Sequence, residues 1–262
     1  RKMIALAAVH LPQTAAVLAD EVYGVRAFGS ETEVMQVQAL VRDKIAVAKE
    51  SIDLTIEHQM VGALKGTVVD ADGSTPILDM YSTFGFTQEL LPWNIATNNT
   101  TVDIKQFCVT LKRKIRNALG GRTFTGVRVK CSEGFFDKLV GHNSMKAAWD
   151  RWNNGQFLRE DQSNADFVFA DVVFQVYSGG TNSGDFIEDG FAYAYPTGVS
   201  RMFHCAYAPA DYMETVNTMG VPYYAKQERM KFDRGVEIET QSNPLVFNKL
   251  PEAVKKITAA AS

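Results

Sequence analysis

The side chains best suited to acid–base or metal chemistry are scattered along this sequence. Its four histidines stand in four unrelated contexts, at His10, His58, His142 and His204. His204 adjoins Cys205 on a predicted strand, where neighbouring side chains point to opposite faces, so these two cannot act together. The pair Glu188-Asp189 could support acid–base chemistry, but a solvated loop is the simpler interpretation. We therefore expect no catalytic residues among them.

The motifs that usually mark an enzyme are also missing from the sequence. It contains no Gly-x-Ser-x-Gly elbow, no His-Glu-x-x-His pair and no dinucleotide-binding fingerprint. Gly120-Gly121-Arg122 is not a phosphate-binding loop, because no Gly-Lys-Ser/Thr follows it. The loop Asp70 to Ser74 resembles a calcium loop only in part, because Tyr81 stands where that loop needs a glutamate. The sequence thus predicts no enzyme, no cofactor and no metal site.

Cysteine usage and bulk composition narrow the class of protein. Cys108, Cys131 and Cys205 are far apart and form no Cys-x-x-Cys pair, which favours buried, reduced thiols in a cytosolic compartment over disulfides or zinc. No run approaches the ~18 consecutive apolar residues of a membrane span. A net charge of −3 argues against tight wrapping of nucleic acid. The chain opens with Arg1 and has no secretory signal, so we expect that a leading segment is missing.

One predicted helix, from Ser30 to Lys65, dominates the sequence. Apolar residues recur at steps of three and four along it, at Val34, Val37, Val41, Ile45, Ala48, Ile52 and Ile56. Ser30 and Glu33 match a capping box at its start, and Gly66 supplies a stop. The helix is about three times the average length. It is therefore expected to act as a spine for other elements or as a strut in an assembly, rather than as a coiled coil.

The segment before this helix is apolar on both faces. The stretch from Met3 to Leu11 is expected to form a strand, followed by a short helix from Thr14 to Val22 and a connector from Gly24 to Gly29. So much apolar surface near a chain end predicts that Met3 to Leu11 pairs with something outside this segment.

The remaining chain mixes helices and strands. Thr67 to Val69 and Ile77 to Tyr81 are expected to form a hairpin, and polar Pro92 to Thr101 a domain boundary. A second amphipathic helix should end at Gly120-Gly121, with basic residues in its last turns complementing its dipole. Further predicted elements are a strand at 126–131, helices capped by Ser132 and Asn143, strands at 166–170, 172–177, 191–195, 223–232 and 235–240, and a corner at 241–244. This irregular order predicts an α+β fold rather than a doubly wound sheet.

Several short stretches, taken together, resemble a known family. They are Ala208-Pro209-Ala210-Asp211 to Gly220, Lys231-Phe232-Asp233-Arg234-Gly235-Val236-Glu237, Gln241-Ser242-Asn243-Pro244-Leu245, Gly24-Val25-Arg26-Ala27-Phe28-Gly29, and Gly62-Ala63-Leu64-Lys65-Gly66 through Ser74. This pattern resembles the lambda-like major capsid proteins of tailed bacteriophages, the phage major capsid protein E family. The resemblance runs through nearly the whole chain in order and is loose only from Phe107 to Phe174.

The resemblance implies the HK-97-type capsid fold. The long helix would be the spine of a peripheral (P) domain over 30–99, which includes the hairpin 67–81 and is joined by returning strands at 225–262. Residues 100–224 would form an axial (A) domain. Residues 1–29 would be the returning limb of the extended (E) loop with its connector, which agrees with the two-faced apolar run. The family's N-terminal arm and the first limb of that loop would precede Arg1.

The resemblance also implies a function. The chain would be a structural major capsid protein that self-assembles into the icosahedral shell of a tailed phage and encloses its double-stranded DNA. It would bind that DNA without sequence specificity, contact no membrane, and have as partners copies of itself in pentamers and hexamers, with scaffold, portal and decoration proteins. It would belong to the virion and assemble in the bacterial host cytoplasm. The residues expected at subunit interfaces are Met3, Ile4, Leu6, Val9, Arg26, Ser178, Asp185, Glu188 and Asp189.

Two other functions stay open on the sequence alone. An encapsulin-like nanocompartment shell protein would share the fold but enclose an enzyme instead of a genome. A soluble enzyme with an unrecognised site would instead need a bound cofactor, or a deep pocket with converging polar groups.

Overall fold

The computed structural model describes residues 4–24, 33–96, 102–154, 166–181 and 184–260. The chain forms two compact units. The first comprises Arg1–Met60, Val69–Ile77 and His204–Val246, and the second comprises Val61–Val68, Leu78–Phe203 and Phe247–Ser262. Helices and sheets are mixed without regular alternation, so the predicted α+β class is confirmed.

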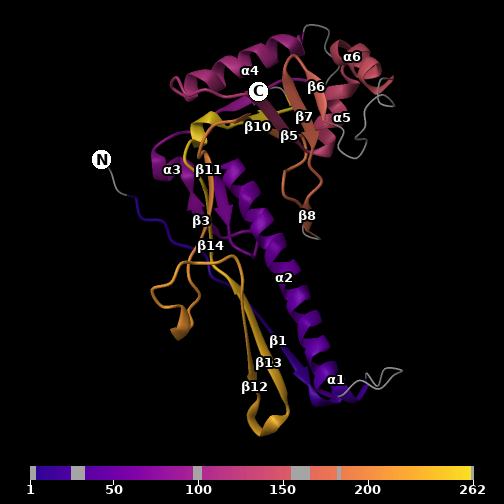
Figure 1. Ribbon diagram of the computed structural model, residues 1–262. Helices are drawn as coiled ribbons and strands as arrows, with labels where there is room; N and C mark the ends of the chain where they lie inside the picture. Colours follow the sequence, from indigo (N-terminus) through magenta and orange to yellow (C-terminus); the bar gives the residue numbers. More distant parts are fainter. Residues whose placement is uncertain (1–3, 25–32, 97–101, 155–165, 182–183, 261–262) are drawn as a thin grey trace. The chain divides into compact units, whose positions relative to one another are not determined.

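The first unit is built on a three-stranded antiparallel sheet and a long helix (Figure 1). The sheet has the order β1 (Leu11–Leu18), β13 (Gly235–Ser242), β12 (Tyr224–Arg229). Leu11 lies opposite Ser242 and Leu18 opposite Gly235, so β1 pairs along its whole length. The short helix α1 (Ala19–Gly24) follows β1, and α2 (Glu33–Lys65) contributes its residues up to Met60 to this unit.

The predicted spine helix is confirmed over the described residues. Helix α2 runs unbroken for 33 residues, about 50 Å at 1.5 Å per residue. Its stripe packs on the sheet through two small clusters: one joins Leu11 to Ile52 and Ile56, and the other joins Val17 to Val41 and Ile238. The capping partner Ser30 lies outside the described residues.

Gly66 ends α2 because the backbone there has a φ of +102°, a conformation that L side chains rarely adopt. A Cβ at this position would also run into the ring of Tyr81. We therefore expect Gly66→Ala to lower the free energy of unfolding by about 2 kcal/mol, measured by urea denaturation. Gly85→Ala is the matched control, because its φ of +77° brings strain without any clash. An equal loss in both variants would contradict the contribution of the Tyr81 contact.

The predicted N-terminal elements are wrong in position. Described residues 4–10 form no strand, and the segment predicted as a helix from Thr14 is strand as far as Leu18. The reason is a long-range pairing: β1 hydrogen-bonds along β13 of the same chain and buries Leu11 and Val17. The pairing of Met3 to Leu11 with something outside stays a prediction, although the Val9 amide already donates to the Pro244 carbonyl at 3.0 Å.

The second unit contains a six-stranded mixed sheet. Its order is β4 (Leu90–Pro92), β15 (Lys255–Thr258), β10 (Phe191–Thr197), β5 (Gly126–Cys131), β7 (Val172–Val176) and β6 (Phe167–Phe169). The pairs β15–β4 and β5–β7 are parallel, and the other three pairs are antiparallel. The predicted strands at 126–131, 166–170, 172–177 and 191–195 therefore all exist.

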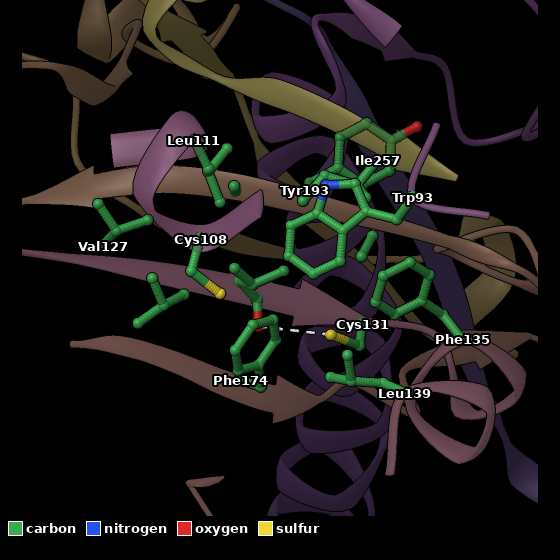
Figure 2. Close-up of a cluster of buried hydrophobic side chains, with 14 of the residues drawn as sticks. Trp93, Cys108, Leu111, Val127, Cys131, Phe135, Leu139, Phe174, Tyr193 and Ile257 are labelled. Carbon is green, nitrogen blue, oxygen red and sulfur yellow. Dashed lines mark hydrogen bonds between the residues drawn. The ribbon is translucent and has the colours of Figure 1, made fainter. Parts of the chain in front are cut away.

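Helices pack on this sheet to form the largest core. They are α4 (Ile104–Ala118), α5 (Glu133–Gly141) and α6 (Asn143–Asn154), with α3 (Met80–Phe84) near the start of the unit. Asp103 caps α4, accepting hydrogen bonds from the amides of Lys105 and Gln106. Figure 2 shows the rings of Trp93, Phe135 and Phe174 gathered inside this core, with Leu111 of α4 on one side of them.

Short elements complete the chain. The two-stranded sheets are β2 (Thr67–Val69) with β3 (Pro76–Asp79), β8 (Gly180–Thr181) with β9 (Gly184–Asp185), and β11 (Phe203–Tyr207) with β14 (Pro244–Asn248). The 3₁₀ turns are Met213–Thr215, Lys231–Asp233 and Pro251–Ala253.

Three predicted boundaries differ from the structure, each for a local reason. The second strand of the predicted hairpin stops at Asp79. The Asp79 carboxylate accepts hydrogen bonds from the amides of Tyr81 and Ser82 and so caps the start of α3. The predicted strand 223–232 ends at Arg229, where a 3₁₀ turn begins. The predicted corner at 241–244 is shorter, because β13 extends to Ser242.

The two units also divide the chain at points other than the predicted boundary at 92–101. Trp93 and Ile95 are buried within the second unit, and their amides donate to the carbonyls of Thr258 and Ala259, both at 2.9 Å. The assignment of residue ranges to P and A domains stays a prediction.

Candidate assembly surfaces

The described residues were searched for metal-binding groups and for membrane-spanning helices. Within those residues, no group of three or more histidine, cysteine or acidic side chains is arranged to hold a metal ion. A search of the same described residues for a helix both long and apolar enough to cross a membrane also finds none. The candidate functional sites considered below are therefore exposed surfaces that could contact other proteins.

The predicted interface residues of the N-terminal segment have different environments. Met3 and Arg26 lie outside the described residues. Ile4 is exposed and Leu6 half-buried. Val9 packs against the cluster of Leu11, Ile52 and Ile56 and so already contributes to this chain's own core.

The predicted interface residues of the second unit lie around and after the β8–β9 hairpin. Ser178 and Asp185 are exposed, and Asp185 pairs with Gly180 in the hairpin. The Asp189 carboxylate accepts the amide of Gly190 at 2.8 Å. Contact of these residues with neighbouring copies stays a prediction.

Glu188 is exposed, as the predicted solvated loop requires, but its carboxylate is also paired with two lysines. Its two oxygens form ion pairs with Lys65 at 3.1 Å and with Lys256 at 3.3 Å. Lys256 in turn lies 4.0 Å from the centre of the Phe191 ring. Burial raises the pKa of Glu188, but the two lysines more than offset this, so the pKa lies below its ordinary value.

The predicted burial of the thiols is right for two cysteines and wrong for one. Cys108 and Cys131 are buried, and burial raises the pKa of Cys108 to about 12 and that of Cys131 further. Cys205 is exposed on β11, which forms a two-stranded sheet with β14. All three are free thiols.

An exposed apolar loop, which was not predicted from the sequence, lies between β11 and β12. Four large apolar side chains stand out within nine residues: Met213 (90% exposed), Val216 (59%), Met219 (91%) and Val221 (45%). Apolar groups gathered on a surface in this way often mark a protein contact. Most of this loop lies in the stretch Ala208–Gly220, which carries part of the family resemblance, and its two methionines were the available sequence signal for an exposed apolar surface.

This apolar loop, residues 213–221, is held in place by hydrogen bonds. The Thr215 hydroxyl donates to the carbonyl of Ala210 at 2.6 Å or that of Tyr212 at 2.8 Å. The Val221 amide donates to the Tyr224 hydroxyl at 3.0 Å. A loop fixed before binding loses less conformational entropy when a partner arrives.

A second exposed apolar group stands at the tip of the β12–β13 hairpin. Phe232 is 86% exposed and has a φ of +65°, which is unusual for a bulky residue. The guanidinium of Arg234 lies 5.6 Å from the centre of its ring. The sequence predicted Phe232 as the end of a strand and so missed this position.

Comparison with known proteins finds one family that matches nearly the whole chain. The profile of the family described as Phage major capsid protein E matches residues 1–259. The chain is 24% identical over 297 aligned residues to the major capsid protein of Salmonella phage Felix O1, which covers 99% of this chain and 79% of that protein.

Solved structures show the same fold at low sequence identity. The capsid of Ralstonia phage GP4 superposes with a TM-score of 0.55 at 9% identity, covering 97% of this chain and 74% of that one. The SrpI encapsulin complex of Synechococcus elongatus gives a TM-score of 0.51 at 8% identity, covering 96% and 74% of the two chains. These likenesses establish the HK-97-type fold for this chain.

Proposed function

Because this chain belongs to the phage major capsid protein E family and is a structural, non-enzymatic protein of the phage head, we propose that its copies tile pentamers and hexamers of an icosahedral shell. The match of the family profile over residues 1–259 is the observation that carries this proposal. Related capsid proteins assemble into shells made of many copies of one protein, and such proteins are components of the virion.

The finer parts of the proposal rest on the family and, for DNA, on the charge of the chain. The shell encloses double-stranded DNA without sequence-specific binding, because a net charge of −3 keeps the wall from adhering to the packaged polyanion. The shell assembles in the host cytoplasm with scaffold, portal and decoration proteins. The long helix serves as the P-domain spine, and residues 100–224 form the A domain.

Many contacts of ordinary strength are enough to hold such a shell together. Each additional contact between subunits that are already joined is effectively intramolecular, so avidity multiplies modest affinities. The encapsulin alternative shares the fold alone, whereas the sequence relatives are phage major capsid proteins. The phage head is therefore the favoured assignment.

The direct test is electron microscopy of the full-length protein expressed in bacteria. We expect closed shells, tubes or capsomers. A species that stays strictly monomeric at high concentration would contradict the proposal. Shells that co-purify with one bound enzyme instead of forming empty or DNA-filled heads would favour the nanocompartment.

The apolar loop 213–221 provides a more specific prediction. We expect the double variant Met213→Ser/Met219→Ser to raise the protein concentration needed for assembly at least tenfold, because it removes exposed apolar area that other copies would bury. Light scattering against concentration measures this threshold. Val168→Ser, which changes a 52% exposed side chain on β6, is the matched control and should leave the threshold unchanged. If wild type, the double variant and Val168→Ser all assembled at the same concentration, the loop would not be an assembly contact.

A further inference from the structure

A groove lies between β1 and α2 in the first unit, and the sequence of the strand explains it. The face of β1 turned toward the helix carries Leu11, Gln13, Ala15 and Val17 in alternation. Leu11 and Val17, at the two ends, are buried in separate apolar clusters with the helix. Ala15 is small and Gln13 is polar and exposed, so neither fills the space between those clusters. A groove of about 470 Å³ is left there.

The groove has an apolar floor and an acidic rim. On the helix side it is lined by Leu40 and Val47, of which Val47 is 65% exposed. Asp43 and Lys44 also line it, and Glu21 of α1 approaches the Lys44 ammonium at 3.5 Å. With Glu21 included as the partner of Lys44, although it is not part of the lining, the charged groups at this rim are two carboxylates and one ammonium.

The hairpin tip that carries Phe232 has the opposite character. Its backbone is fixed by the Met230 amide, which donates to the Gly235 carbonyl at 3.0 Å, and by the Asp233 amide, which donates to the Met230 carbonyl at 3.1 Å. This turn holds Phe232 in the left-handed region, where a glycine or asparagine would be less strained. The fold itself does not require an aromatic ring there, since the ring is 86% exposed.

The charges around that ring are mainly positive. Within the hairpin tip, residues 229–234, the ring is flanked in sequence by Arg229, Lys231 and Arg234, and Asp233 is the one acidic residue. Asp233 pairs with Arg229 at 3.7 Å, and Arg234 lies over the ring. The tip is thus an exposed aromatic side chain among mainly positive charges, and it complements in polarity and sign an apolar groove with a net negative rim.

We propose that Phe232 of one copy docks into the β1–α2 groove of a second copy, with the basic tip facing Asp43 and Glu21. Within one chain Phe232 is 86% exposed, so it does not fill its own groove. A projecting patch that fits a groove elsewhere on the same protein forms a head-to-tail contact, which can build rings or extended assemblies. This inference rests on the proposed function, because a shell supplies the second copy.

The first test separates assembly from folding. Phe232→Gly removes the ring and relieves the strained φ, so the melting temperature of the unassembled full-length chain should stay the same or rise. The assembly threshold should rise at least tenfold. On the groove side, Val47→Lys should have the same effect, since it places an ammonium where the basic tip approaches. Leu54→Lys is its matched control, because Leu54 is 42% exposed on the same helix and does not line the groove. Unchanged thresholds for both Phe232→Gly and Val47→Lys would overturn the inference.

The second test identifies the contact directly. Full-length protein with p-benzoylphenylalanine at position 232 is mixed with ¹⁵N-labelled protein, irradiated after assembly and digested for mass spectrometry. We expect cross-links from 232 to peptides covering 13–15 or 40–48 of the labelled copy. Cross-links that reach only other segments would overturn the inference while the proposed function stands. If the wild-type protein forms no assemblies at all, the proposed function itself fails, and this inference fails with it.

Discussion

Trp93→Ala is expected to lower the free energy of unfolding of the second unit by about 4 kcal/mol. Trp93 is only 2% exposed, and its ring stacks on Phe107 at a centroid distance of 5.7 Å. Phe135 and Phe174 approach it at 6.1 Å each (Figure 2). Truncation leaves a cavity surrounded by three rings that strands and helices hold in place, so the core cannot collapse to fill it.

The experiment uses the unassembled full-length protein, so that shell contacts do not obscure the effect. The remaining tryptophans, Trp149 and Trp152, both lie in the second unit, and their fluorescence during urea denaturation reports on that unit. Phe86→Ala, at a 44% exposed aromatic residue of the same unit, is the control and should change stability by less than about 0.5 kcal/mol. A loss below about 1 kcal/mol for Trp93→Ala would contradict the central position of this ring.

Sequence reasoning succeeded where structure is determined locally. The helices α2 and α4 repeat apolar residues at helical spacing and end at glycines with positive φ, so their existence could be predicted from the sequence. The strand β5 alternates cleanly and matches its predicted bounds, 126–131. In these stretches, local preference and tertiary packing favour the same structure.

Prediction from the sequence failed where a strand far away in the chain determines the local structure. The stretch from Thr14 to Leu18 contains alanines that suit a helix, yet it is strand because Glu239 to Gly235 of β13 lie alongside it. The pairing joins residues more than two hundred positions apart, and no local sequence pattern predicts it.

The candidate surfaces were hard to predict for a different reason. An apolar residue in a sequence is normally assigned to a core, so the exposure of Met213, Met219 and Phe232 could not be read from residue type alone. The neighbouring turn residues Asn217 and Asp233 both have positive φ, and asparagine and aspartate, which tolerate that conformation, were a further local sign of a projecting loop. Which copies these surfaces contact depends on the assembly, which a single sequence does not encode locally.

Glu89→Gln is expected to cost about 3 kcal/mol at neutral pH, because it removes the counter-charge of a buried lysine. The Lys255 side chain on β15 is only 6% exposed, and its ammonium lies 2.7 Å from a Glu89 oxygen. The other Glu89 oxygen accepts a hydrogen bond from Lys114 of α4. Without Glu89, Lys255 is left as a buried charge with no ionised partner among these groups, which costs far more than losing a surface ion pair.

Lys255→Met provides the matched control for this prediction. It replaces the buried ammonium with an apolar chain of similar length, so the double variant Glu89→Gln/Lys255→Met should recover most of the stability lost in Glu89→Gln. Tryptophan fluorescence during urea denaturation measures all four proteins of the cycle. A double variant as unstable as the sum of its parents would show that the two residues are not coupled.

The pH dependence follows from the same ion pairs. Burial raises the pKa of Glu89, but hydrogen bonds from Lys114 and Lys255 outweigh it, so the folded-state pKa lies below the ordinary 4.5. A carboxylate with a depressed folded pKa stabilises the fold above its unfolded pKa, and this stabilisation is lost as pH falls through the folded value. The stability difference between wild type and Glu89→Gln should therefore be constant from pH 7 to about 5 and narrow below about 4. A difference that stays unchanged down to pH 2 would mean that the Glu89 charge contributes nothing, and that the variant is destabilised through packing.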